Sequence, residues 1–185
     1  MKRIFLVRHC ASDGQHKDSP LTYEGIRQAQ VLSTFFDKQN ITFDKIISSP
    51  YLRAIESIKP YAEQVSTKIE VNENLRERIL SEQPIDDWLD VLEHSFADLS
   101  FNLPGGESGN DAIKRANSVL ETIYANDTLK NVIIVSHGNL IALLLKQFDD
   151  AFGFEQWKNL RNPDVYVINS DLQSHTIECL WDSNI

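Results

Sequence analysis

The sequence predicts an α/β domain, a three-layer α/β/α sandwich with a mostly parallel central sheet. Two observations predict it. Residues 4–7 and 132–136 are short apolar runs, which suit strands buried on both faces. Segments with helical periodicity alternate with such runs along the chain, which is typical of layered α/β domains. A chain of 185 residues, 42% of them hydrophobic, can form one domain with a sizeable core. We therefore predict a single domain over residues 1–185.

The first half of the chain predicts strands at 4–7, 44–48 and 69–71, with a helix after each of the first two. Thr22 is the expected N-cap of a helix that reaches about residue 38. Ser49 and Pro50 are the expected N-cap and first residue of the next helix, which Pro60 would kink or end. The expected inner faces are apolar: Ile26, Ala29, Val31, Leu32, Phe35 and Phe36 in one helix, and Leu52, Ile55, Ile58 and Ala62 in the other.

The second half continues the alternation of helices and strands. We predict a helix over 83–99, whose apolar residues are Trp88, Leu89, Leu92 and Phe96. Ser108 is the expected N-cap of the next helix, which has the clearest helical period of the chain over 112–124. A strand at 132–136 and a buried helix at 140–145 follow. The chain would end in strands 165–169 and 176–180, a hairpin turned by residues 170–173.

Bulk properties exclude several classes of protein. The net charge of −9 argues against non-specific nucleic-acid binding, which depends on basic patches. No apolar run reaches the ~20 residues of a membrane span, and the N-terminal apolar stretch is too short for a secretion signal. Cys10 and Cys179 are too few for a disulfide framework and have no zinc spacing. We expect a cytoplasmic protein without a metal, a nucleic-acid partner or a membrane partner.

Polar residues follow three of the predicted strands directly. They are Arg8-His9, the stretch 48–53 with Arg53, and Ser136-His137-Gly138. In open α/β sheets, ligands bind outside the carboxyl ends of the strands, where helix N-termini also attract anions. Arginine offers forked donors that match phosphate oxygens. Two histidines and two arginines at one sheet edge therefore predict a site for a phosphoryl group.

Six motifs in series resemble those of the histidine phosphatase superfamily, the phosphoglycerate-mutase-like family. They are Leu6-Val7-Arg8-His9, Pro20-Leu21-Thr22-x-x-Gly25-x-x-Gln28-Ala29, Ser48-Ser49-Pro50-x-x-Arg53-Ala54, Leu75-Arg76-Glu77, Gly105-Gly106-Glu107-Ser108 and Ser136-His137-Gly138. The resemblance implies a metal-independent phosphatase, without a cofactor, that forms a phosphohistidine intermediate.

The resemblance also assigns roles to individual residues. His9 would be the nucleophile, and Arg8, Arg53 and a protonated His137 would hold the phosphate. Glu77 would be the proton donor, with Glu107 as a second candidate. The substrate-binding residues would be Arg8, Gln15, Arg53, Glu107, His137 and Gly138. Because like charges nearby oppose protonation, we expect at least one of the two histidines to be neutral.

The sequence departs from the family pattern at several positions. Cys10 follows the histidine where glycine is usual, which predicts a narrower or redox-sensitive pocket, and Gln15 replaces a common asparagine. The Gly-x-Trp-Glu-Gly stretch of many relatives is absent after Glu77, so residues 78–104 would be an insertion that covers the substrate. The chain lacks the extra length of the glycolytic mutases, which favours hydrolysis over mutase action.

Three alternatives stay open. A His9-Cys10 pair also opens the phosphate loop of cysteine-dependent phosphatases, but these need an arginine six positions after the cysteine, where this chain has His16. A mutase would return the phosphoryl group to a second hydroxyl, and a non-catalytic regulator would only bind a phospholigand. The expected partner is a small phosphorylated substrate or a phosphorylated protein. Neither its identity nor the oligomeric state follows from the sequence.

Overall fold

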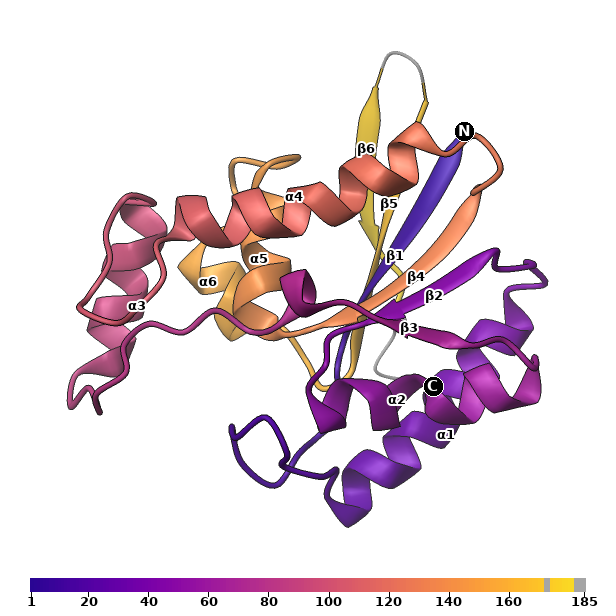
Figure 1. The fold of residues 1–185 in the computed structure, drawn as a ribbon, viewed down its shortest axis with the longest axis horizontal. Helices are drawn as coiled ribbons and strands as arrows, with labels where there is room; N and C mark the ends of the chain where they lie inside the picture. Colours follow the sequence, from indigo (N-terminus) through magenta and orange to yellow (C-terminus); the bar gives the residue numbers. More distant parts are fainter. Residues whose placement is uncertain (172–173, 182–185) are drawn as a thin grey trace.

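The computed structural model describes residues 1–171 and 174–181, and its centre is a six-stranded sheet (Figure 1). The strand order is β3-β2-β4-β1-β5-β6. The three pairings among β3, β2, β4 and β1 are parallel, and β5 and β6 add antiparallel pairings at the other edge. The strands are β1 (Lys2–Arg8), β2 (Lys45–Ser48), β3 (Ile69–Val71), β4 (Asn131–Ser136), β5 (Asp164–Ser170) and β6 (His175–Cys179). The predicted α/β fold with a mostly parallel sheet is confirmed.

Helices cover both faces of the sheet, which gives three layers. Figure 1 shows α1 and α2 below the sheet and α4 and α5 above it, with α3 at one end of the molecule. The helices are α1 (Tyr23–Lys38), α2 (Leu52–Gln64), α3 (Trp88–Ala97), α4 (Gly109–Ala125), α5 (Gly138–Lys146) and α6 (Phe154–Lys158), and a short 3₁₀ helix spans Glu73–Leu75. The predicted N-caps hold at α1 and α4, where Thr22 and Ser108 accept backbone N–H groups.

The side chains of β1 show how one strand supplies two cores. Ile4 and Leu6 pack into the cluster beneath α4 and α5. Phe5 and Val7 point to the opposite face and pack into the cluster beneath α1 and α2. All four are buried, which explains why the strand reads as a continuous apolar run rather than an alternating one.

The second helix begins later than the sequence predicts. Tyr51 is the N-cap of α2, and Leu52 is its first residue. Ser49 instead forms a turn, in which its hydroxyl accepts the backbone N–H of Tyr51 at 3.2 Å. Of the two effects expected of Pro60, a kink or an end of the helix, the second is wrong, because α2 continues through Pro60 to Gln64.

Other predictions for the helices also differ from the structure. Ile26, expected on the inner face of α1, is 54% exposed, and Trp88 and Leu89 of α3 are also exposed. Helix α3 starts at Trp88 rather than near residue 83, so residues 83–87 form a loop. The predicted turn at 170–173 includes residues 172 and 173, which lie outside the described residues.

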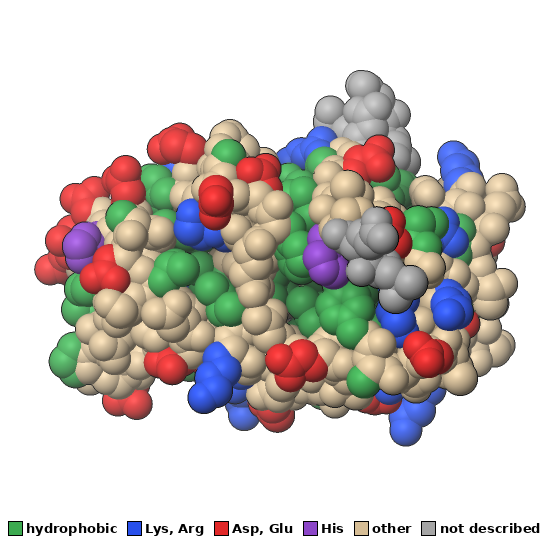
Figure 2. Space-filling view, turned by 90° about the horizontal axis from the view of Figure 1, so that it is seen from above, with side chains coloured by type: hydrophobic (Ala, Val, Ile, Leu, Met, Phe, Trp, Pro, Cys, Tyr) green, Lys and Arg blue, Asp and Glu red, His purple; other side chains and the backbone are tan. Residues whose placement is uncertain are grey.

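The surface is acidic at the end where α3 lies, as Figure 2 shows. Exposed carboxylates on α3 and its flanking loops include Asp86, Asp87, Asp90, Glu93 and Asp98. Within residues 1–171 and 174–181, no helix has the length and apolar character needed to cross a membrane.

Candidate active site

The strand register brings the three polar junctions together at one edge of the sheet. Arg8 lies opposite Ser136 in the β1–β4 pair, and Ser48 lies opposite Val135 in the β2–β4 pair. The ring centroids of His9 and His137 are consequently 5.2 Å apart. The expectation that the carboxyl ends of these strands converge is confirmed.

His9 is held with one ring nitrogen committed to the backbone. Its Nδ1 lies 2.7 Å from the carbonyl oxygen of Cys10, which requires Nδ1 to carry the proton and donate. The other nitrogen, Nε2, is therefore unprotonated, and its electron pair accepts a hydrogen bond from the Nε–H of Arg53 at 3.2 Å. Burial, together with the nearby charges of Arg53 and Arg8, lowers the pKa of His9 to about 3. The predicted neutral imidazole is confirmed.

The two arginines are anchored by carbonyl oxygens of the backbone. Arg53 is almost fully buried, and its Nη1 donates to the carbonyls of Gln15 and His16 at 3.2 and 2.9 Å. The Nη1 of Arg8 donates to the carbonyl of Leu160 at 2.6 Å, whereas its buried Nε has no partner within the described residues. Two guanidinium groups thus flank His9 with fixed orientations.

His137 is fully buried, and its Nε2 lies 2.7 Å from the hydroxyl oxygen of Ser49. Its Nδ1 is buried and lacks a partner in the described part of the chain. Burial is the largest cause that lowers the pKa of His137 well below its ordinary value, and the electrostatic interactions with His9, Arg53, Arg115 and Arg8 follow. Without a bound phosphate the ring is therefore neutral, because burial and the nearby arginines disfavour its protonation. The expectation that a protonated His137 takes up the charge of a bound phosphate stays a prediction.

Gly138 follows His137 and is the first residue of α5, next to the side chain of Arg8. A Cβ atom at this position would lie 3.1 Å from the Nε of Arg8 and 3.2 Å from its Cζ. Glycine therefore allows the guanidinium of Arg8 to lie directly against the start of the helix.

Glu77 lies at the N-terminus of α5, although it belongs to a distant part of the chain. Its carboxylate accepts the backbone N–H groups of Asn139 and Leu140 at 3.1 and 3.0 Å, and that of Arg78 at 2.9 Å. Burial raises the pKa of Glu77. The three N–H groups and the charge of Arg8 lower it, but burial has the larger effect. A carboxyl group with a raised pKa next to Arg8 can carry a proton to a bound phosphate ester.

Glu107 and Gln15, the other predicted site residues, have different surroundings. The Glu107 carboxylate forms a bidentate ion pair with Arg115, at 2.6 and 2.9 Å. Gln15 contributes its backbone carbonyl to Arg53, and its side chain is exposed in the loop before α1. The structure therefore brings Arg8, His9, Arg53, Glu77 and His137 together, and it places Glu107 in a separate pair.

Cys10 points away from the two histidines. Its side chain is buried in the apolar cluster beneath α1 and α2, and its backbone N–H donates to the Ser57 hydroxyl at 2.8 Å. Burial raises the pKa of the Cys10 thiol to about 12, whereas nucleophilic cysteines are thiolates near neutral pH. Cys10 has no positive φ, so this position does not need glycine. The expected narrowing of the pocket is wrong, and the cysteine-nucleophile alternative loses its support.

Sequence reasoning missed three contributors to the site. Ser49 positions His137, and the Leu160 carbonyl anchors Arg8. The ring of Tyr51 contacts two site residues, with its centroid 4.9 Å from that of His137 and 4.9 Å from the Cζ of Arg53. Ser49 lies in a motif noted above, but a backbone carbonyl such as that of Leu160 leaves no signal in a sequence.

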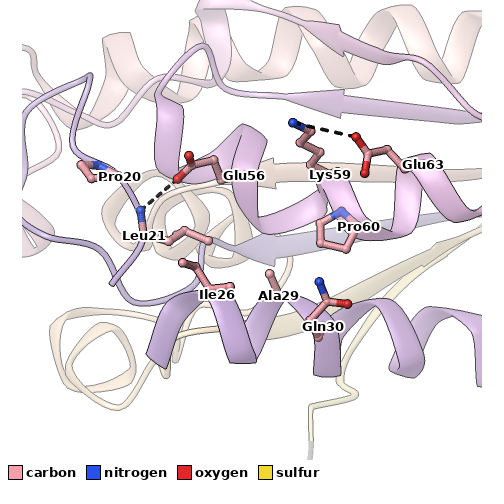
Figure 3. A pocket seen from close by; sticks show the side chains of 9 residues that line it. All are labelled: Pro20, Leu21, Ile26, Ala29, Gln30, Glu56, Lys59, Pro60 and Glu63. Carbon is pink, nitrogen blue, oxygen red and sulfur yellow. Dashed lines mark hydrogen bonds and ion pairs between the residues drawn. The ribbon is translucent and has the colours of Figure 1, made fainter. Parts of the chain in front are cut away.

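Two further features lie outside this group of residues. A cavity of about 420 Å³ opens between α1 and α2, and none of the predicted site residues lines it (Figure 3). Within residues 1–171 and 174–181, no cluster of three or more His, Cys, Asp or Glu side chains has a metal-binding arrangement.

Comparisons with known proteins identify the family of the chain. The family model described as histidine phosphatase superfamily (branch 1) matches residues 4–183. A Hydrogenobacter thermophilus protein named "Putative phosphoserine phosphatase 2" is 32% identical over 157 residues, which cover 76% of this chain and 75% of that protein. A Yersinia pestis protein named "Probable phosphoglycerate mutase GpmB" is 30% identical over 162 residues, which cover 78% of this chain and 74% of that protein.

A solved structure shows the same fold. The structure of a mycobacterial glucosyl-3-phosphoglycerate phosphatase with inorganic phosphate superposes with a TM-score of 0.77 at 22% identity, covering 99% of this chain and 98% of that one. The chain therefore belongs to the histidine phosphatase superfamily, and it is a phosphatase of that family.

Proposed function

We propose that this phosphatase hydrolyses phosphomonoesters through a phosphohistidine on the Nε2 of His9, without a metal ion. One observation carries the proposal: the Cys10 carbonyl accepts the Nδ1–H of His9, which leaves the electron pair on Nε2, the nitrogen beside Arg53. With a pKa of about 3, this nitrogen is unprotonated and nucleophilic at neutral pH.

The neighbouring cations suit the charge that develops during phosphoryl transfer. In such reactions most of the stabilisation comes from fixed donors that contact the equatorial phosphate oxygens. The unpartnered Nε of Arg8 and Nδ1 of His137 are donors available for these oxygens. The Nε of Arg53, which donates to the Nε2 of His9, becomes a third donor when Nε2 attacks phosphorus. A bound phosphate dianion would also raise the pKa of His137, so the ring can take up a proton when it binds the substrate.

Glu77 supplies the proton transfers in this proposal. In the first step Nε2 attacks phosphorus, the bond from phosphorus to the ester oxygen breaks, and Glu77 gives its proton to the departing oxygen. In the second step water attacks phosphorus and gives a proton to Glu77, and the P–N bond breaks to return the electron pair to His9. Splitting the reaction in this way replaces one difficult displacement by two easier ones.

Release of phosphate from p-nitrophenyl phosphate and from a panel of phosphorylated metabolites, measured in EDTA, tests the proposal. We expect wild-type activity to survive EDTA and to disappear in His9→Ala. Full activity in His9→Ala would refute the role of His9, and complete loss in EDTA would refute metal independence. Phosphate binding without turnover of any ester would favour a non-catalytic binding protein.

Phosphoglycerate mutase action is a second candidate, supported by the similarity to the Yersinia protein named above. Incubation with 3-phosphoglycerate separates the two reactions, because a mutase forms 2-phosphoglycerate whereas a phosphatase releases phosphate. We expect phosphate release to dominate.

Two finer expectations accompany the proposal. Residues 78–104 are the segment that we expect to contact the leaving group, since Arg78 adjoins Glu77 and its side chain reaches Ser95 in α3. Both cysteines are free, as we expect of a protein in the reducing cytoplasm.

A further inference from the structure

Arg78 is a buried arginine whose side chain extends away from the catalytic edge of the sheet and contacts helix α3. It is only 5% exposed, although it directly follows Glu77. Its Nε donates to the Glu107 carbonyl at 2.9 Å, and its Nη1 donates to the Ser95 hydroxyl in α3 at 3.0 Å. These two hydrogen bonds fix the side chain, because burying a guanidinium costs free energy unless its donors are paired. Its third buried donor, Nη2, has no partner within the described residues.

We propose that Arg78 is a positioning residue that holds Glu77 in place for proton transfer by tying the catalytic segment to α3 and to the turn before α4. The inference rests on the proposed role of Glu77 as the proton donor. Arg78 itself contacts neither His9 nor the other arginines in the hydrogen bonds described, and it acts through its neighbour.

The turn before α4 offers a rigid anchor for this purpose. The backbone N–H of Glu107 donates to the Ile79 carbonyl at 2.8 Å, next to the bond from Arg78. Gly106 packs so closely that an added Cβ would lie 2.1 Å from the Leu80 carbonyl oxygen. Residues 78–80 are therefore held against this turn by a side-chain hydrogen bond from Arg78, a backbone hydrogen bond to Ile79 and the close packing of Gly106 on Leu80.

Glu107 and Arg115 extend the anchor to helix α4. The carboxylate of Glu107 pairs with Arg115, which also donates from Nη1 to the Asn74 carbonyl at 2.7 Å. The segment that carries Glu77 is thus held on both sides, at Asn74 before it and at Arg78 and Ile79 after it. Glu107 has a structural role in this network.

The link to Glu77 is short. The backbone N–H of Arg78 is one of the three donors to the Glu77 carboxylate, and the other two belong to the start of α5. Any shift of Arg78 changes the angle at which the carboxyl group faces the site. Displacement of a reacting group by about 1 Å can cost about 10²-fold in rate.

Leaving-group dependence separates this role from a merely structural one. A p-nitrophenolate ion departs without a proton, whereas an alkoxide needs one from Glu77. We would measure kcat/KM of Arg78→Lys and Ser95→Ala on p-nitrophenyl phosphate and on an alkyl phosphate that the wild type hydrolyses. Glu77→Gln sets the pattern for loss of the proton donor, and Arg27→Lys is the control, an exposed arginine of α1 that pairs with Glu24 and lies outside the anchor.

We expect Arg78→Lys to lower kcat/KM for the alkyl ester by about tenfold, a part of the roughly 10²–10⁴-fold that general acid–base catalysis contributes. Activity on the aryl ester should stay within about twofold, and Ser95→Ala should show the same pattern with a smaller loss. Thermal unfolding of each variant measures the folded fraction, so that the rates refer to folded enzyme.

Equal losses on both esters in Arg78→Lys and Ser95→Ala, with Glu77→Gln selective for the alkyl ester, would overturn the role of Arg78 and leave Glu77 in place. Equal losses in Glu77→Gln would instead refute the proton-donor role and the proposal that rests on it. A selective loss in Arg27→Lys as large as that in Arg78→Lys would also overturn the assignment.

Discussion

Replacement of Gly138 by alanine should lower activity without lowering stability. The new Cβ would lie 3.1 Å from the Nε of Arg8, and Arg8 cannot retreat freely because the Leu160 carbonyl holds its Nη1 at 2.6 Å. The guanidinium must therefore shift by a few tenths of an ångström. A 1 Å displacement costs about 10²-fold, so this smaller shift should lower kcat/KM about threefold to tenfold.

The free energy of unfolding of Gly138→Ala should rise slightly or stay unchanged. Gly138 is the first residue of α5, where alanine is favoured over glycine by roughly 0.5–1 kcal/mol. That gain offsets the crowding at Arg8, so we expect the free energy of unfolding to stay within about 1 kcal/mol of wild type.

Steady-state hydrolysis of p-nitrophenyl phosphate and urea unfolding measure the two quantities. Gly153→Ala is the matched control, because a Cβ there would meet only the Gln156 side chain at 3.9 Å. Unchanged kcat/KM in a folded Gly138→Ala protein would refute the placement of Arg8 against the substrate phosphate. A similar loss in Gly153→Ala would show that the effect is not local.

Three further predictions concern pH, the cysteines and the N-terminal strand. The pKa of His9 is about 3 in the folded protein and about 6.5 in the unfolded chain. Between these pH values the unfolded chain binds more protons than the folded protein. The free energy of unfolding therefore falls as pH drops below about 6.5, by up to about 1.4 kcal/mol per pH unit. Urea titrations from pH 7 to 4 should show a weaker dependence in His9→Gln than in wild type; equal slopes would contradict the buried neutral ring. Iodoacetamide should modify exposed Cys179 and spare Cys10 in the native protein, and Cys10→Ala should keep its activity; a Cys10 adduct by mass spectrometry, blocked by phosphate, would restore the cysteine-nucleophile reading. Lys2→Met should lower the free energy of unfolding by about 1–2 kcal/mol, because its ammonium donates to the carbonyls of Ile123, Asn126 and Leu129 at the end of α4; unchanged urea unfolding would show that these bonds add nothing.

The strands and the catalytic edge could be predicted because their signals are local. A continuous apolar run at Ile4–Val7 followed at once by Arg8 and His9 indicates both a buried strand and the place where it ends. The same reasoning applies to Ser136 and His137. Since parallel neighbours end at the same sheet edge, the pairing of the two histidines followed from the fold class, and the register confirms it.

Other features depend on packing that the sequence does not reveal. Ser49-Pro50 has the composition of a helix start, but the Ser49 hydroxyl bonds to the Tyr51 N–H and to His137, and α2 starts two residues later than predicted. Pro60 is tolerated within a helix because the tertiary packing of α2 outweighs local preference.

The charge states of the site depend on burial, which the sequence does not show. The structure buries His137 completely beside His9, Arg53 and Arg8, so its pKa is lowered while no phosphate is bound. A protonated His137 was expected only around a bound phosphate, and that expectation stays a prediction. Likewise Cys10 follows the nucleophile directly in sequence, but it lies beyond the end of β1, where its side chain packs into the apolar cluster that also contains Phe5 and Val7.

Isolation of the covalent intermediate tests the central claim most directly. Wild-type enzyme would be mixed with p-nitrophenyl phosphate, quenched in alkali, where phosphohistidine survives, and digested for mass spectrometry. We predict phosphate on the peptide that contains His9, lost on mild acid treatment and absent from His9→Ala. Phosphate on Ser49 or on Cys10, or an active enzyme that never becomes phosphorylated, would contradict the account.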